Sequence, residues 1–254
     1  MDARPIVRVG RSGWAHHEGH THGTFETWDD FEVGGGFPAR KLHVFLPTDA
    51  LHSGRRYPVV YLHDGDAVFW RGGAVGNTWD AAGLLDRLRA GDHVAPVILV
   101  AIHPGDRNAE YTHADWSHGA RSYGRLPAFA DVVADGVKAF VDAAYPTDPS
   151  PAATVVAGSS HGGLAAFWMA VARPDRFGAA VALSPSFFTG IDSLVHGPAP
   201  VGLEGSALLQ VAHPTLADPA RRPRLWISWG ARRDGGDHNA VVEALAALRG
   251  AEMA

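Results

Sequence analysis

The 254-residue chain contains no cysteine, which excludes disulfides, thiolate metal sites and a cysteine nucleophile together. No run of about 18 uninterrupted apolar residues occurs, so the sequence predicts no membrane span. A basic excess is also lacking: 22 lysines and arginines stand against 27 aspartates and glutamates, a net charge of −5. This balance argues against a protein that holds nucleic acid by charge. No P-loop, dinucleotide fingerprint or heptad run is present, so no nucleotide cofactor or coiled-coil assembly is indicated.

The beginning of the chain does not have the pattern of a signal peptide. Residues 1–17 contain an early arginine but no apolar run of about 7 to 15 residues. We therefore expect a cytoplasmic protein with no membrane or nucleic-acid partner, and the sequence does not indicate an oligomeric state. Hydrophobic residues make up 46% and charged residues 19% of the chain, which is typical of a globular protein and not of a disordered one.

Short apolar runs alternate with helical patterns along most of the chain. Strands are expected at 41–47, 57–63, 96–103, 154–158, 179–183 and 224–229, and helices at 77–90, 126–145, 161–173 and 237–248. This alternation is typical of an α/β fold with a mostly parallel central sheet and helices on both faces. We expect one domain over residues 1–254. Within it, residues 1–36 form an N-terminal arm or extra strands, and residues 186–223 form a variable cap or connecting region.

The clearest chemical signal is the stretch TVVAGSSHGG at residues 154–163. A predicted strand is followed by a Gly-x-Ser-x-Gly pattern and then by a predicted helix. This context is typical of a sharp strand-to-helix turn that presents a nucleophilic serine, with glycines giving the room that the turn needs. Ser160 occupies the central place. Ser159 does not, because the residue two positions after it is His161 and not glycine.

A nucleophile of this kind needs two amide donors for the oxyanion that forms on the substrate. One is expected from the residue after the nucleophile, His161, and the other from the loop after an earlier strand. That loop reads LHDGD at 62–66, and the amide near Asp66 is the candidate. The His161 side chain itself is interpreted as a packing or substrate contact and not as the general base.

Two longer segments, RRYPVVYLHDGDAVFW and VAGSSHGGLAAFWMAVARPDRFGAAVALSPSFF, resemble the putative esterase family of α/β-hydrolases. That family includes enterochelin esterase-like, feruloyl esterase-like and mycolyltransferase-like proteins. The resemblance runs from about Lys41 to the C-terminus. It implies an α/β-hydrolase fold, a serine/acid/histidine triad and cleavage of a small-molecule carboxylic ester through an acyl-enzyme at Ser160, with no cofactor and no metal. An acyltransferase using the same site is the alternative.

The acid of the triad is less clearly indicated than the serine. The resemblance places it after the strand expected at 224–229, where Asp234 is our first candidate and Asp237 the second. Asp192, after the preceding strand, is a third candidate, because some hydrolases carry the acid there.

The resemblance also implies a histidine after one more strand beyond the acid, whereas this sequence ends at Ala254 and its last histidine is His238. Three explanations remain open. The natural protein is longer and carries the last strand with its histidine; or His238 serves as the base from an unusual position; or the chain is a non-catalytic binding protein on the same fold.

Several further residues are expected near a substrate. His63, Trp70, Arg107 and Tyr111 follow predicted strands or lie in loops between elements, and we assign them to substrate binding. The stretch HHEGHTH at 16–22 has a spacing that could hold a metal. Because it contains glycine and shows no helical pattern, we interpret it as an arm that lines a cleft or lies on the surface.

Overall fold

The computed structural model describes residues 3–73, 76–113, 117–118, 121–187 and 206–229. It divides into two compact units. Unit 1 comprises Met1–Gly105 and Val132–Val155, and unit 2 comprises Asp106–Asp131 and Val156–Ala254. The single domain expected over residues 1–254 stays a prediction. Within the described ranges, no helix combines the length and the apolar character needed to cross a bilayer.

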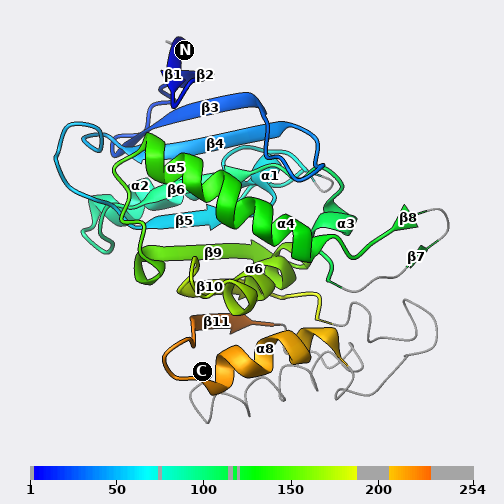
Figure 1. Ribbon diagram of the computed structural model, residues 1–254. Helices are drawn as coiled ribbons and strands as arrows, with labels where there is room; N and C mark the ends of the chain where they lie inside the picture. The colour runs from blue at the N-terminus through cyan, green and yellow to red at the C-terminus, as the bar shows by residue number, and fades with distance from the viewer. Residues whose placement is uncertain (1–2, 74–75, 114–116, 119–120, 188–205, 230–254) are drawn as a thin grey trace. The chain divides into compact units, whose positions relative to one another are not determined.

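Unit 1 is built on a sheet whose strands lie in the order β1 (Ala3–Arg8), β2 (Arg11–His16), β3 (Gly23–Phe31), β4 (Arg40–Pro47), β6 (Ile98–Ile102) and β5 (Val59–Leu62) (Figure 1). The pairs β1–β2, β2–β3, β3–β4 and β4–β6 are antiparallel, and β5–β6 is parallel. The expectation of a mostly parallel sheet is therefore wrong for this part of the chain. For β1–β2, β2–β3 and β3–β4, short connections explain the difference, because parallel neighbours need a crossover of about a dozen residues or more.

The β1–β2 turn is a clear case of such a short connection. Val9 and Gly10 both have positive φ, at 49° and 73°, as a two-residue type I′ hairpin requires. Residues 1–36, expected as an arm or extra strands, thus supply β1, β2 and β3. By contrast, the longer connection between β5 and β6 carries two helices, and these two strands are parallel.

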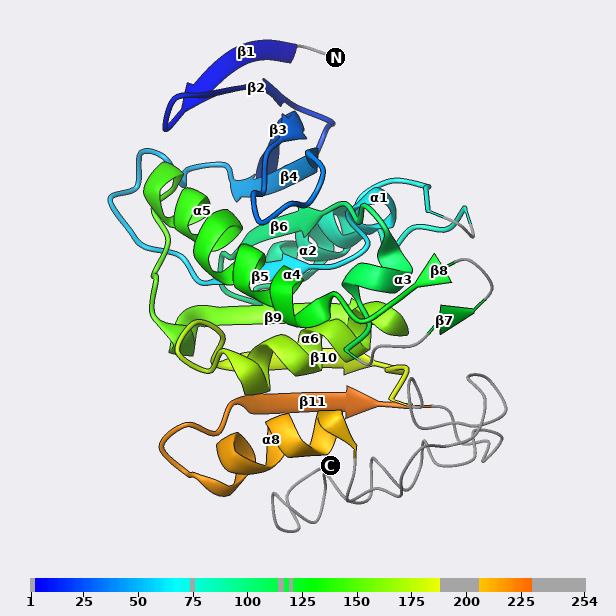
Figure 2. The ribbon, with the colours of Figure 1, turned by 45° about the vertical axis from the view of Figure 1, so that its right-hand side comes forward.

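The helices of unit 1 cover both faces of its sheet. Figures 1 and 2 show α5 (Lys138–Ala144) on one face and α1 (Gly65–Val68) and α2 (Ala81–Ala90) on the other. The helix α2 begins four residues later than the pattern at 77–90 predicts, after Asp80, whose φ of 48° is outside the helical region. The helix predicted at 126–145 is present as α4 (Leu126–Val132), a π-helical turn (Val133–Val137) and α5.

Unit 2 contains the strands β9 (Thr154–Ser159), β10 (Ala179–Leu183) and β11 (Arg224–Ser228), and β10 pairs with β11 in parallel. Its helices are α3 (Arg107–Glu110), α4, α6 (His161–Ala172) and α8 (Ala207–Ala217). The two-stranded ribbon β7–β8 (Ser117–His118 and Arg121–Ser122) lies between α3 and α4 in the sequence. The strands predicted at 154–158, 179–183 and 224–229 and the helix at 161–173 are confirmed. Every residue of α6 from Gly162 to Val171 is buried, which is typical of a central helix.

The region at 186–223 contains a helix that the sequence did not indicate. Helix α8 begins after Ser206, whose Oγ accepts a hydrogen bond from Leu209 N at 3.5 Å, and it contains Pro214. An internal proline argues against a helix in a sequence, because it removes one backbone hydrogen bond. The helix predicted at 237–248 lies outside the described residues.

A chain of polar side chains crosses the sheet of unit 1. His16 Nε2 lies 3.2 Å from Thr27 Oγ1, Thr27 Oγ1 lies 2.8 Å from His43 Nδ1, and His43 Nε2 lies 3.1 Å from His103 Nε2. Burial, with the nearby imidazole of His103 as the second cause, lowers the pKa of His43 to about 3. The pKa of His16 and that of His103 are also lowered, mainly by burial. The fold therefore holds these histidines neutral.

This network makes the protein sensitive to acid. The unfolded chain binds a proton at His43 below pH 6.5, whereas the folded protein does not until about pH 3, so folding stability falls as the pH drops between these values. For one such group, the free energy of unfolding changes by about 1.4 kcal/mol per pH unit. Urea unfolding at pH 7.5 and pH 5 should show a smaller loss in His43→Gln than in wild type. His52→Gln, at an exposed position, is the control and should keep the wild-type loss; equal losses in all three proteins would contradict the assignment.

Candidate active site

Ser160 stands at the junction of β9 and α6 with a backbone conformation that is rare outside glycine. Its φ is 57° and its ψ is −122°, and a residue held in such a region costs about 1 to 3 kcal/mol. The side chain is exposed to solvent. This is the strand-to-helix turn that the sequence predicted, with the serine presented outward.

The glycine two residues before Ser160 allows this turn to close. A Cβ added at Gly158 would lie 2.3 Å from the carbonyl oxygen of Gly162 and 2.9 Å from its Cα. The chain therefore passes itself at a distance that no side chain at 158 would permit. The first glycine of the pattern around Ser160 thus has a direct steric cause.

Backbone hydrogen bonds fix Ser160 from both sides. Its N–H donates to the carbonyl oxygen of Leu183 at 2.9 Å. Its carbonyl oxygen accepts from Leu164 N at 3.0 Å and from Ser186 N at 3.1 Å. The segment after β10 and the first turn of α6 thus share the task of holding the strained residue.

Two side chains extend this contact. Ser186 Oγ lies 3.2 Å from Ser160 Oγ, and His161 Nδ1 lies 2.9 Å from Ser186 Oγ. The sequence analysis did not single out Ser186 as a site residue. The available signal was its place in the LSPSF segment at 183–187, which supported the family resemblance.

The beginning of α6 provides an environment for negative charge. His161 is the first residue of this helix, and the first four N–H groups of an α-helix have no partner within the helix. The helix dipole adds a partial positive charge at the same end. The amide of His161 is accordingly placed as the sequence predicted for one oxyanion donor, while that role itself stays a prediction.

Arg107 and Tyr111 lie in the same unit as Ser160. Arg107 begins α3, and its Nη2 donates to the carbonyl oxygen of Ser159 at 3.4 Å. Its guanidinium also lies 5.5 Å from the centre of the Tyr111 ring. Tyr111 is fully buried and packs against Phe129 with a ring distance of 5.8 Å. The structure thus places Arg107 next to Ser159, which precedes Ser160. The substrate contacts predicted for Arg107 and Tyr111 stay predictions.

The other three predicted positions lie in unit 1. His63 follows β5 and is 1% exposed, and Asp66 is the second residue of α1. Trp70 is half-buried, donates from Nε1 to Glu18 at 2.5 Å and contacts an aromatic group that includes Phe25, with ring centres 4.9 Å apart. Their predicted roles in substrate and oxyanion binding are untested by these contacts.

The candidate acids Asp192, Asp234 and Asp237 and the candidate base His238 lie outside the described residues. The described part of the site therefore consists of the nucleophile, its amide and side-chain neighbours, and Arg107.

The histidines at 16–22 contact different groups, except that the rings of His16 and His20 both pack against Phe25. His16 contacts Thr27; His17 Nδ1 accepts from Gly19 N at 3.0 Å; His20 packs edge-on against Phe25 and Phe45; and His22 Nδ1 lies 3.0 Å from Asp86. Among the residues that the structure describes, no group of three or more histidine, aspartate or glutamate side chains is arranged to hold a metal ion.

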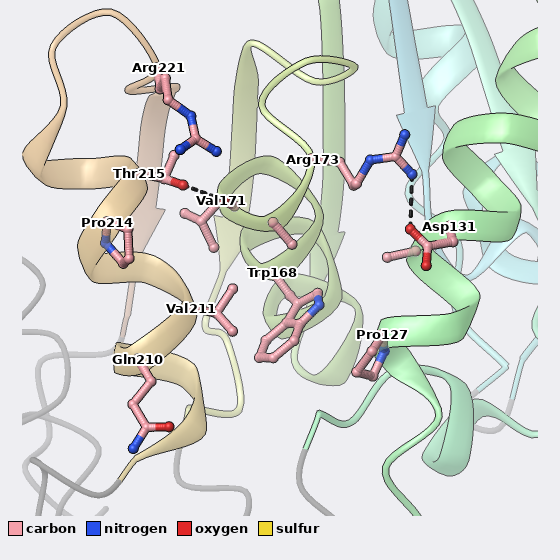
Figure 3. A pocket seen from close by; sticks show the side chains of 12 residues that line it. Pro127, Asp131, Trp168, Val171, Arg173, Gln210, Val211, Pro214, Thr215 and Arg221 are labelled. Carbon is pink, nitrogen blue, oxygen red and sulfur yellow. Dashed lines mark hydrogen bonds and ion pairs between the residues drawn. The ribbon is translucent and has the colours of Figure 1, made fainter.

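A separate cavity of about 370 Å³ lies in unit 2 among α4, α6 and α8 (Figure 3). Trp168 lines it from α6, and Arg173 and Arg221 also line it. Arg173 is held by Asp131 at 2.9 Å. Trp168 follows Ser160 by eight residues in the sequence, so its backbone is about 12 Å further along the helix axis. None of the predicted site residues lines this cavity.

The geometry at Ser160 defines a nucleophile turn of the kind found in serine hydrolases with an α/β-hydrolase fold. A family model described as "Putative esterase" matches residues 38–253. The chain belongs to this family and is a carboxylic ester hydrolase.

Solved structures support the fold. An IroE-like serine hydrolase from Shewanella oneidensis aligns with a TM-score of 0.64 and 20% identity, over 88% of this chain and 69% of that one. A ferulic acid esterase aligns with a TM-score of 0.61 and 20% identity, over 90% of this chain and 86% of that one. The enterobactin esterase FES from Shigella flexneri aligns with a TM-score of 0.58 and 21% identity, over 89% of this chain but only 50% of that one. A search of curated proteins found no match.

The glycine contact at the turn leads to a direct prediction. Gly158→Ala places a methyl group against the backbone of Gly162, so the turn has to open and both thermal stability and ester hydrolysis should fall strongly. Gly136→Ala is the comparison, because its added Cβ would meet Val33 O at 3.1 Å instead of the 2.3 Å found at Gly158, so it should affect stability and activity far less. Thermal unfolding and hydrolysis rates of both variants test this. A Gly158→Ala protein as stable and as active as wild type would disprove the steric role.

Proposed function

We propose that the chain cleaves small-molecule carboxylic esters through an acyl-enzyme formed at Ser160. The observation that carries this proposal is the exposed side chain of Ser160 on a backbone with φ 57° and ψ −122° at the beginning of a buried helix. A serine with a purely structural role gains nothing from a strained, solvent-facing position. A nucleophile needs both features, since it must reach a substrate and transfer its proton.

The reaction proceeds in two steps. Ser160 Oγ attacks the ester carbonyl while its proton passes to a histidine, and the carbonyl oxygen becomes an oxyanion that accepts from the amides of His161 and Asp66. The carbonyl then re-forms, the alcohol leaves with the proton from the histidine, and the acyl group stays on Ser160. Water, deprotonated by the same histidine, releases the acid and restores the serine.

We propose Asp234 as the acid and His238 as the base, with Asp237 and Asp192 as the other acids. A histidine beyond Ala254 in a longer natural protein is the competing assignment for the base. An ester of an aromatic carboxylic acid or of a hydroxy acid is the proposed substrate class. It is supported by the names of the similar proteins, which act on ferulic acid esters and enterobactin, and a cytoplasmic location is proposed with it.

Replacing the nucleophile tests the proposal most simply. Ser160→Ala should reduce hydrolysis of p-nitrophenyl acetate by about 10⁴-fold or more, because the oxyanion donors and substrate binding remain but no acyl-enzyme forms. Ser159→Ala, one residue earlier, is the matched control and should retain most of the activity. Equal rates in wild type and Ser160→Ala would refute the proposal. Acetyl transfer to an added alcohol in preference to water would identify an acyltransferase.

The base can be assigned with the same assay. If His238 accepts the proton of Ser160, His238→Ala should lower kcat about as much as Ser160→Ala, and Asp234→Asn should lower it less, because the acid orients the base without exchanging its proton. Unchanged activity in His238→Ala would remove His238 as the base. The intact mass and the C-terminal peptide of the natural protein distinguish the alternative, since a mass well above 26.9 kDa with a C-terminal peptide that continues past Ala254 would indicate further residues there.

A further inference from the structure

A buried hydroxyl contacts the candidate nucleophile from the segment after β10. Ser186 is 4% exposed, and its Oγ lies within hydrogen-bonding distance of both Ser160 Oγ, at 3.2 Å, and His161 Nδ1, at 2.9 Å. A serine/acid/histidine triad uses neither contact, because in that arrangement the nucleophile bonds directly to the base.

We propose that Ser186 is a positioning residue whose hydroxyl donates a hydrogen bond to Ser160 Oγ and is oriented by the imidazole of His161. The three side chains form a branch that is separate from the acid and base. This inference rests on the proposed function, because it gives Ser186 a part in the reaction at Ser160.

The proton count favours this direction. Each hydroxyl carries one proton and can accept two hydrogen bonds, so the contacts Ser160–Ser186–His161 can be ordered in three ways. If Ser186 donated to His161, or accepted from both neighbours, the proton of Ser160 would point to Ser186 and away from a base. If His161 Nδ1–H donates to Ser186, Ser186 donates to Ser160, and the proton of Ser160 stays available for transfer. This third order is the one that a nucleophile requires.

The backbone holds this hydroxyl in place before any substrate binds. Ser186 N donates to the carbonyl oxygen of Ser160 at 3.1 Å. The next residue, Phe187, is fully buried and packs edge-on against Phe167 of α6, with ring centres 5.1 Å apart. On the other side, a Cβ at Gly163 would lie 3.2 Å from the Cα of Pro185. The segment at 185–187 therefore fits closely onto α6, and its hydroxyl is preorganised.

A donor at this position stabilises the reacting oxygen. As Ser160 gives its proton to the base, its oxygen gains negative charge and becomes a stronger acceptor, so the bond from Ser186 strengthens toward the transition state. Ser186 keeps its own proton throughout. No proton passes through it, and the reaction written above is unchanged in its balance.

Steady-state kinetics with p-nitrophenyl acetate test the inference. Ser186→Ala should lower kcat by about 10- to 100-fold with KM little changed, and Ser186→Thr, which retains a hydroxyl, should recover a large part of the loss. Ser184→Ala is the matched control, because it removes an exposed hydroxyl two residues earlier in the same segment and should leave kcat unchanged. Thermal unfolding of each variant accompanies the kinetics.

Substitutions of His161 test its orienting role. His161→Asn retains a side-chain N–H close to the position of Nδ1 and should keep most of the activity, whereas His161→Leu should resemble Ser186→Ala. The double variant Ser186→Ala/His161→Leu should be no slower than Ser186→Ala, because both changes act through one hydroxyl.

Three kinetic results would overturn the inference. They are a wild-type kcat in Ser186→Ala, additive losses in the double variant, and a loss of kcat that Ser186→Thr does not recover while the unfolding temperature falls in parallel. A readout without turnover complements them: in ¹⁵N-histidine spectra, the His161 Nδ1 signal, assigned with His161→Asn, should shift in Ser186→Ala. An unchanged signal would also overturn the inference. Absence of ester hydrolysis in the wild type would instead count against the proposed function, and the spectra would still decide the hydrogen bond.

Discussion

The strained backbone of Ser160 is the constraint on which the site depends. A residue with φ 57° and ψ −122° does not keep this conformation by itself, so the surrounding chain has to supply the energy. Here the hydrogen bonds of Ser160 with Leu183, Leu164 and Ser186 stabilise the conformation. The absence of a side chain at Gly158 lets the chain pass close to Gly162. The same contacts that impose the strain direct the side chain into solvent and place it at the beginning of α6.

The two units use polar side chains for different purposes. In unit 1, His16, Thr27, His43 and His103 form a hydrogen-bonded chain in which burial keeps the imidazoles neutral. This chain ties three strands together and makes the fold dependent on pH. In unit 2, His161 and Ser186 stand beside an exposed serine. These four histidines thus stand in different surroundings, and the surroundings determine what each can do.

Much of the fold could be predicted from the sequence, for identifiable reasons. The apolar runs of β9 and β10 and the length of α6 gave the nucleophile's setting, since the turn between them is a local feature with a steric signature. Strand direction in unit 1 could not be predicted in the same way, because it depends on which strands become neighbours. The late beginning of α2 follows from one residue with positive φ, Asp80, and α8 was missed because Pro214 breaks the pattern without breaking the helix.

In the candidate site, too, local features could be predicted from the sequence and contacts between distant residues could not. Ser160 and the amide of His161 follow from the motif, because residues adjacent in sequence are adjacent in space. Ser186 lies 26 residues from Ser160 in the chain, and only the packing of its segment onto α6 brings the two hydroxyls together. Sequence spacing carries no information about such a contact.

The proposed role of Ser160 is that of a nucleophile held ready to react. Treatment with a fluorophosphonate, followed by intact-mass measurement and peptide fragmentation, tests it most directly: the account predicts one adduct, on Ser160, and an unlabelled protein or an adduct on Ser159 or Ser186 would contradict it.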